Sequence, residues 1–324
     1  METKFTLARN SGLNPSIVAS LKTVPVDGFS YQYYKLRHPG AIYNLMSSKL
    51  VDSISMLCKD LNERKVENIK SKFRLVLYDF FQFYESFYEI MLCFCGQHKA
   101  PKDNEPIHSW LKNRYNVGED FYKYTSNYLQ KLRMYYNEIK HSSNEVQFMI
   151  FKNSLQICPA YFLDMPKNAY QGPVEPVSLN RELKAIYFLI YMMSDKLNDV
   201  LSTHLETIYG FQLLLSKEHI SDDAFQKLNN SINLLTDFYL LSEIGMSAFK
   251  SRIDDDNIVF AKTTITEDLF DDYYGDGFNL EMKVTHNGYD NSYFVPSCGI
   301  EQIKSSFYYK NGNGVLRELK VIEC

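Results

Sequence analysis

The sequence has no long apolar run. Its closest stretch, residues 185–193, is flanked by Lys184 and Asp195 and is too short for a bilayer, which takes about 20 apolar residues. The first residues, METKFTLARNSG, also lack the apolar core of a signal peptide. We therefore expect a cytoplasmic protein with no membrane partner.

Cysteines are few and do not form a disulfide framework. The chain has 324 residues, and its six thiols are Cys58, Cys93, Cys95, Cys158, Cys298 and Cys324. Their scattered spacing is typical of a reduced, cytosolic protein. Cys93 and Cys95, with His98 nearby, would need a further ligand to bind zinc tetrahedrally, so buried thiols are the simpler interpretation. We expect no metal ion and no cofactor.

No strong excess of one charge marks the chain. Its net charge is −4, so a nucleic-acid site would have to be a local basic patch. Hydrophobic residues make up 45% and charged residues 23%, as in a folded protein. Tryptophan occurs once, against 25 tyrosines and 22 phenylalanines. These rings suit a core and its rim, and exposed ones could also stack on bases.

Helical periodicity dominates the first three quarters of the chain. Proline and glycine interrupt residues 1–40, which we expect to be an irregular N-terminal arm apart from a short strand or packed arm at 29–36. Apolar residues then recur at helical spacing in six segments. These expected helices are residues 41–61, 66–95 with Gly96 as the C-cap, 107–114, 121–143, 179–207 with Ser178 as the N-cap, and 221–249.

Strand patterns occupy the remainder. Residues 146–151 and 155–163 are rich in β-branched and aromatic residues and predict a strand pair, a β insertion near 146–163. After residue 251 the helical period is lost, and Asn311–Gly314 predicts a hairpin turn. Further strands are expected at 257–265, 280–285 and 292–295. The sequence predicts a mainly α protein, α+β overall, with a helical bundle at 41–250 and a small β-rich module at 251–324.

One predicted helix, residues 121–143, gathers the chain's most site-like side chains. Its apolar stripe is Phe121, Tyr124, Tyr128, Leu132, Tyr135, Tyr136 and Ile139. Arg133, Asn137 and either Lys140 or His141 share another face, because they are separated by about one helical turn each. Such a face combines a cation, an amide and a titratable imidazole. The alternative is that Lys140 and His141 only stabilise the helix C-terminus.

The segment Asn137-x-x-Lys140-His141 at the end of a long helix resembles the motif of the HEPN superfamily. In that family an arginine is followed by a polar residue and then, after a short gap, by a histidine. His141 matches the histidine and Asn137 the polar position. Tyr136 stands where the arginine is expected, and Arg133 is the nearest arginine.

The resemblance implies a helical-bundle fold and a place in bacterial antiviral defence, stress or toxin–antitoxin systems. Many HEPN proteins are metal-independent endoribonucleases that act as dimers. It implies that His141, Asn137 and Arg133 are catalytic and that Lys140 and Tyr136 contact the substrate. RNA and a homodimer or protein partner are the expected partners.

A second hypothesis belongs to another class. Because Tyr136 replaces the family's arginine, the chain could have lost catalysis and kept the fold. It would then be a non-catalytic helical scaffold or regulatory subunit that binds a protein partner through its aromatic surface and its β-rich module.

Overall fold

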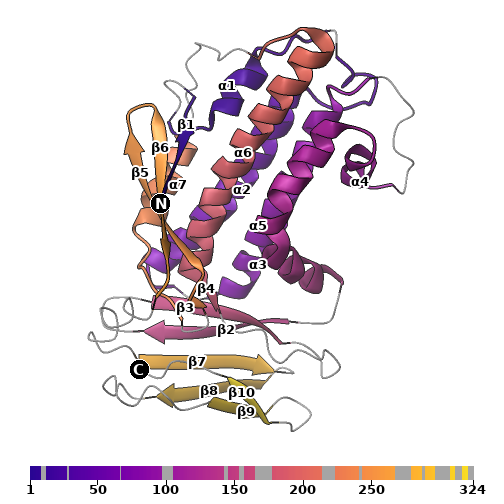
Figure 1. Cartoon of the computed structure of the whole chain (residues 1–324). Helices are drawn as coiled ribbons and strands as arrows, with labels where there is room; N and C mark the ends of the chain where they lie inside the picture. The colour runs from indigo at the N-terminus through magenta and orange to yellow at the C-terminus, as the bar shows by residue number, and fades with distance from the viewer. Residues whose placement is uncertain are drawn as a thin grey trace.

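The computed structural model describes most of the chain. It covers residues 1–8, 12–27, 29–65, 67–96, 105–141, 145–152, 157–164, 177–213, 223–240 and 243–266, and the strands at 279–286, 289–295, 307–310 and 316–319. The described chain is mainly α with smaller antiparallel sheets, which confirms the expected fold class (Figure 1).

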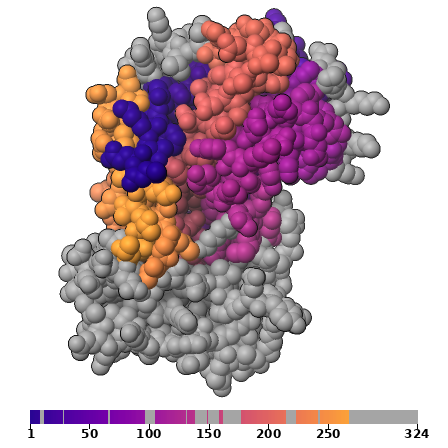
Figure 2. Space-filling view, viewed as in Figure 1, coloured from indigo at the N-terminus to yellow at the C-terminus, as the bar shows by residue number. Residues whose placement is uncertain are grey.

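The helices form a bundle built around four long members. These are α2 (Pro39–Asn62), α3 (Ile69–Leu92), α5 (Asn116–His141) and α6 (Leu179–Tyr209). The shorter helices are α1 (Ser16–Lys22), α4 (Ile107–Lys112) and α7 (Ala224–Asn233). Figure 2 shows α5 and α6 side by side on one face of the bundle, and they are in contact.

Two local signals begin and end α6. Ser178 caps its start by accepting a hydrogen bond from the Arg181 amide at 3.4 Å, as its position before the apolar repeat predicted. Gly210 ends it with φ of +61°, a left-handed conformation that favours glycine. Helix α3 ends earlier than expected, with Cys93 rather than Gly96 as its C-cap.

The core between these helices is strongly aromatic. Phe73, Phe80, Phe83 and Phe87 of α3 are fully buried. Tyr43 of α2 packs edge-on against Phe83, with ring centroids 5.5 Å apart. The high content of phenylalanine and tyrosine is therefore explained in large part by core packing.

A three-stranded antiparallel sheet covers α6. Its order is β1 (Glu2–Thr6), β6 (Asn257–Thr264), β5 (Ser247–Asp254), so the first strand of the chain pairs with a strand more than 250 residues later. Phe249 of β5 stacks on Phe188 of α6 with ring centroids 4.3 Å apart. This contact fixes the sheet on the helix.

A five-stranded antiparallel sheet lies at one end of the bundle (Figure 1). Its order is β4 (Val177–Ser178), β3 (Ile157–Asp164), β2 (Glu145–Lys152), β7 (Asn279–His286), β8 (Tyr289–Val295). Strands β9 (Phe307–Lys310) and β10 (Leu316–Leu319) form the expected hairpin. The predicted pair β2–β3 is confirmed, and strand pairing crosses the boundary expected at residue 251.

Two segments differ from the expectation. The N-terminal arm is not wholly irregular, since it contains β1 and α1. Residues 29–36 form turns and coil instead of a strand, and they pack on the core through Phe29, Tyr31, Tyr34 and Leu36, which confirms the alternative of a packed arm. The helix expected over 221–249 ends at Asn233. Beyond it, side chains of α6 bind the main chain, because Lys184 Nζ donates to the Leu235 carbonyl at 2.8 Å and Asn180 to that of Thr236 at 3.1 Å. These bonds replace those a continuing helix would make.

Candidate functional site

Helix α5 carries all the residues expected to form the site. It is one unbroken helix from Asn116 to His141, and Glu119 in its first turn is favourable for the helix dipole. Its core-facing stripe is shifted from the predicted one. Leu129 is fully buried, whereas Tyr124 and Tyr128 are 42% and 49% exposed. The predicted aromatic stripe therefore includes two surface tyrosines.

Tyr136 lies in the core. Its ring stacks on Phe81 of α3, with centroids 4.4 Å apart and planes 25° from parallel, and the residue is only 7% exposed. A ring in this position packs against α3 and is not presented to solvent. This differs from the expected contact between Tyr136 and substrate, and the physical reason is the aromatic seam between α5 and α3.

Arg133 lies one turn earlier and is half-buried. Its guanidinium carbon is 5.4 Å from the centroid of the Tyr84 ring, a cation–π contact. Among the residues the structure describes, no carboxylate forms an ion pair with it. Long helical side chains lean toward the helix N-terminus, which brings this guanidinium back along α5 onto Tyr84 of α3. Within the described residues, its guanidinium is therefore not neutralised by a carboxylate, which suits it to an anionic ligand.

The remaining predicted residues follow along the helix. Asn137 is exposed one turn after Arg133. The backbone of α5 continues as helix through Lys140 and His141, so helical geometry puts these positions on the turns after Asn137. The side chains of residues 138–141 lie outside the described part of the chain. Arg133 and Asn137 thus share a face, and the placement of the Lys140 and His141 side chains stays a prediction.

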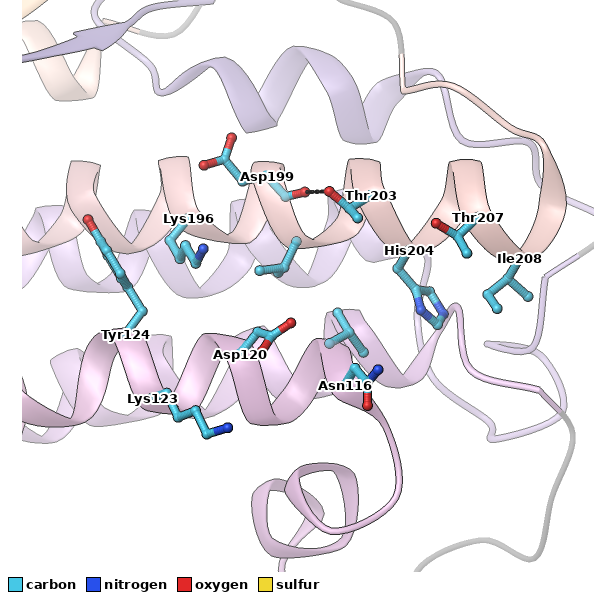
Figure 3. A pocket seen from close by; sticks show the side chains of 12 residues that line it. Asn116, Asp120, Lys123, Tyr124, Lys196, Asp199, Thr203, His204, Thr207 and Ile208 are labelled. Atoms are coloured by element: carbon cyan, nitrogen blue, oxygen red, sulfur yellow. Dashed lines mark hydrogen bonds between the residues drawn. The ribbon is translucent and has the colours of Figure 1, made fainter.

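A groove of about 620 Å³ runs between the first turns of α5 and the last turns of α6. The two helices are antiparallel here, so Asn116 lies opposite His204, and Asp120 lies opposite the stretch that carries Lys196 and Asp199 (Figure 3). Lys196 of α6 lies 5.1 Å from the ring centroid of Tyr124. The volume is within the range of about 300–1,000 Å³ that is typical of small-molecule sites.

The groove lining carries both signs of charge. Asp120 and Asp199 share it with Lys123 and Lys196. Burial lowers the pKa of His204, although a hydrogen bond with the Phe94 carbonyl at 3.3 Å opposes this effect. The net effect favours the neutral form of the His204 imidazole. The groove suits a small polar molecule better than a polyanion, because neither charge predominates.

A second cavity of about 360 Å³ lies farther along α5 and α6, beside β5 and β6. Arg181 and Glu182 form part of its wall. Arg181 is almost fully buried, binds Glu182 at 2.6 Å and also pairs with Glu243. This ion-pair group links α6 to the chain segment before β5, so its first role is structural.

No group of three or more metal-binding side chains occurs among the described residues. Cys93 and Cys95 are buried, and their thiols hydrogen-bond to the carbonyls of Glu89 and Met91 within α3. Burial raises the pKa of Cys95 to about 12, so it is a neutral thiol. His98 lies outside the described residues. Among the described helices, none is both long and apolar enough to cross a membrane.

No protein-family model matches this sequence, and no curated protein and no solved structure shows significant similarity to it.

The groove residues were not apparent from the sequence. His204 has no ligand-like partner at helical spacing, and the carbonyl that it contacts, that of Phe94 just after α3, is more than 100 positions away. The surface positions of Tyr124 and Tyr128 could have been recognised from the sequence, because the polar hydroxyl of tyrosine makes it better suited than leucine to a solvent-exposed position. Arg133 was identified from the sequence, whereas its aromatic partner Tyr84 was not.

Proposed function

We propose that the C-terminal half of α5 contacts RNA and that the chain is a HEPN-like, metal-independent endoribonuclease or RNA-binding protein of a bacterial defence or stress system. The observation that carries the proposal is Arg133. It is a half-buried arginine that has an aromatic partner but, within the described residues, no carboxylate. An arginine in this state is suited to bind a phosphate with two parallel hydrogen bonds.

The chemistry of RNA cleavage assigns a role to each neighbouring residue. His141 takes the proton from the ribose 2′-hydroxyl, whose oxygen then forms a bond to phosphorus. The bond from phosphorus to the 5′-oxygen breaks, and that oxygen receives a proton. Asn137 orients the imidazole or the phosphate, while Arg133 and Lys140 stabilise the negative charge of the transition state.

A homodimer would supply the second proton-transfer group. One histidine cannot act as base and acid in the same step, so the 5′-oxygen would take its proton from His141 of a second copy. The same assembly doubles the number of cations around the phosphate. The proposal therefore includes a two-fold arrangement of α5 C-termini.

The burial of Tyr136 favours a second candidate function. The position that holds arginine in the HEPN motif is occupied here by a ring stacked on Phe81. A chain with this substitution retains the fold and, on this hypothesis, serves as a non-catalytic scaffold or regulatory subunit for a protein partner. A chain that binds RNA without cleaving it could do so as a homodimer or together with a protein partner.

The proposal is tested with purified protein, mixed single-stranded RNA and excess EDTA. Arg133→Gln should raise KM and lower kcat, because Arg133 binds both the phosphate and the transition state. Arg114→Gln is the matched control, since Arg114 is exposed and pairs with Glu105 at 3.2 Å. Absence of RNA binding and cleavage by the wild-type protein would overturn the proposal.

A further inference from the structure

Helices α4 and α5 are in contact (Figure 1), and five half-buried polar residues lie along the two helices. His108 and Lys112 are one turn apart on α4, and Tyr122, Ser126 and Arg133 follow one another along α5. We call these five residues the donor strip. Each of them is half-buried, and each can donate a hydrogen bond.

Close packing of the two helices holds the α4 part of the strip against the first turns of α5. Gly118 in α5 passes so near to α4 that a Cβ atom there would lie 2.8 Å from the carbonyl carbon of Leu111. Lys112 Nζ is 3.9 Å from the ring centroid of Tyr122, which directly links the two helices. The Lys112 side chain is thus held in place by the packing of the two helices and does not extend freely into solvent.

An ordered aromatic layer forms the floor of the strip. Tyr84 and Tyr88 of α3 are buried, with their hydroxyl oxygens 2.8 Å apart. The ring of His108 lies against Tyr88, with centroids 5.9 Å apart, while Arg133 lies over Tyr84. Two neighbouring rings thus hold the imidazole and the guanidinium on the same side of α3.

The strip has an excess of positive charge. Within the described residues, no carboxylate pairs with Arg133 or Lys112. Glu119 pairs with Lys123 at 2.7 Å, which lowers its pKa, and the charge of Lys112 adds to this lowering without forming an ion pair. Burial lowers the pKa of His108, and the nearby charges of Arg133 and Lys112 lower it further. Both effects favour the neutral form of the imidazole.

We propose that the donor strip binds a phosphate group, with Arg133 and Lys112 as the cationic contacts and His108 as a hydrogen-bonding contact. The inference goes beyond the proposed function, because it assigns α4 residues to a site that binds phosphate whether or not the chain cleaves RNA. A half-buried cation without an anionic partner loses part of its stabilisation by water, and a bound anion compensates for this loss. Arginine and lysine together match phosphate geometry and charge.

The experiment follows the histidine ring signals by NMR during pH titrations at constant ionic strength. Sulfate, which does not titrate in this range, replaces chloride as the phosphate analogue. The His108 signal is identified by its loss in His108→Gln. The pKa of His108 should rise in sulfate, because a bound anion offsets Arg133 and Lys112.

The same spectra contain an internal control. His204 is also half-buried with a lowered pKa, but no neighbouring cation contributes to that lowering, so sulfate should leave its pKa unchanged. Lys112→Gln and Arg133→Gln should each reduce the sulfate response of His108, whereas Arg114→Gln should not. No response of His108, an equal response of His204, or an unchanged response in both strip variants would overturn the proposal.

Two further titrations separate the sources of phosphate. Uridine 3′-monophosphate is compared with an oligouridylate of about ten nucleotides, a length within the span of single-strand sites. A response to the oligonucleotide at much lower concentration identifies an RNA backbone site, and an equal response identifies a nucleotide site. Either result supports phosphate binding. The two proposals can fail separately. If RNA cleavage does not depend on His141 but the pKa of His108 still responds to the anion, the nuclease proposal fails and the phosphate-binding proposal stands.

Discussion

The guanidinium of Arg133 lies over the ring of Tyr84, with its Cζ atom 5.4 Å from the ring centroid. Tyr84 is itself held by hydroxyl contacts to Tyr88 at 2.8 Å and to Thr125 at 3.3 Å. Thr125 donates to the Phe121 carbonyl at 2.8 Å, so its oxygen accepts from Tyr84, which in turn accepts from Tyr88. These hydroxyl hydrogen bonds connect the core of the bundle to Arg133. Of the cations predicted for the site, Arg133 is the one whose side chain the structure describes.

The first prediction concerns this hydroxyl chain. Tyr84→Phe keeps the ring under Arg133 but leaves the buried Tyr88 hydroxyl without its acceptor, so it should cost about 1–3 kcal/mol of unfolding free energy. Tyr78→Phe on the same helix is the control, because Tyr78 is 52% exposed. Urea denaturation measures both. Equal stability of the two variants would show that the hydroxyl chain does not stabilise the fold.

The second prediction concerns the buried arginine. Arg181→Leu leaves Glu182 and Glu243 buried without their cation and should destabilise the protein by about 3–5 kcal/mol. Arg252→Leu, which removes an exposed pair with Glu2 at 3.1 Å, should cost about 0–1 kcal/mol. Adding Glu243→Gln to Arg181→Leu should restore part of the loss. Similar urea midpoints for the two arginine variants would contradict this assignment.

The third prediction is a pH dependence at Asp237. Burial raises the pKa of this carboxyl, but Lys184 at 2.7 Å and Lys250 at 2.5 Å outweigh burial and bring the pKa below 3.8. The charged form therefore stabilises the folded protein above pH 3.8, and this contribution is lost as the pH falls through the lower, folded-state pKa.

Asp237→Asn should accordingly be about 1.5–3 kcal/mol less stable than the wild type at pH 7. The difference should shrink in urea titrations at the lowest pH values at which the protein still folds. Asp254→Asn is the control, because Asp254 is exposed and pairs with Lys4 at 3.3 Å. A stability gap that stays constant down to the acid limit would rule out the proposed charge effect.

The fourth prediction uses salt. If Lys112 contacts an RNA phosphate, Lys112→Gln should reduce the slope of log affinity against log salt by about 0.7, the value for one contact to a single strand. Lys123→Gln should leave the slope unchanged, because Lys123 is exposed and paired with Glu119. Fluorescence anisotropy with a labelled oligouridylate gives both slopes. Identical slopes for wild type and Lys112→Gln would exclude a backbone contact.

Strong periodicity made the long helices predictable. Helix α6 was expected at 179–207 and is Leu179–Tyr209, because its apolar repeat and the Ser178 cap are local signals. The helix expected over 221–249 stops at Asn233 because Lys184 and Asn180 bind the carbonyls of residues 235 and 236. Those donors are about 50 positions away, so the local pattern does not contain this information. The same holds for β1, whose partner is β6.

The candidate site was predictable in part. Helical spacing correctly put Arg133 and Asn137 on one face, but it did not indicate that Tyr136 would fill the seam against Phe81. It also did not indicate that His108 of α4 would lie against Tyr88, next to the Tyr84 ring that contacts Arg133, because α4 is only six residues long and has a weak local pattern. Contacts between helices, rather than spacing within one helix, determine which side chains gather there.

The most direct measurement of the central claim is the rate of RNA cleavage in EDTA by the wild-type protein and by His141→Ala. We predict that the wild type cleaves single-stranded RNA and that the variant is slower by about 10²–10⁴-fold, the usual contribution of an acid–base group. His108→Gln serves as a second histidine control that should alter binding more than the chemical step. Equal cleavage by wild type and His141→Ala, or none by either, would contradict the proposed nuclease mechanism, and absence of RNA binding as well would contradict the whole account.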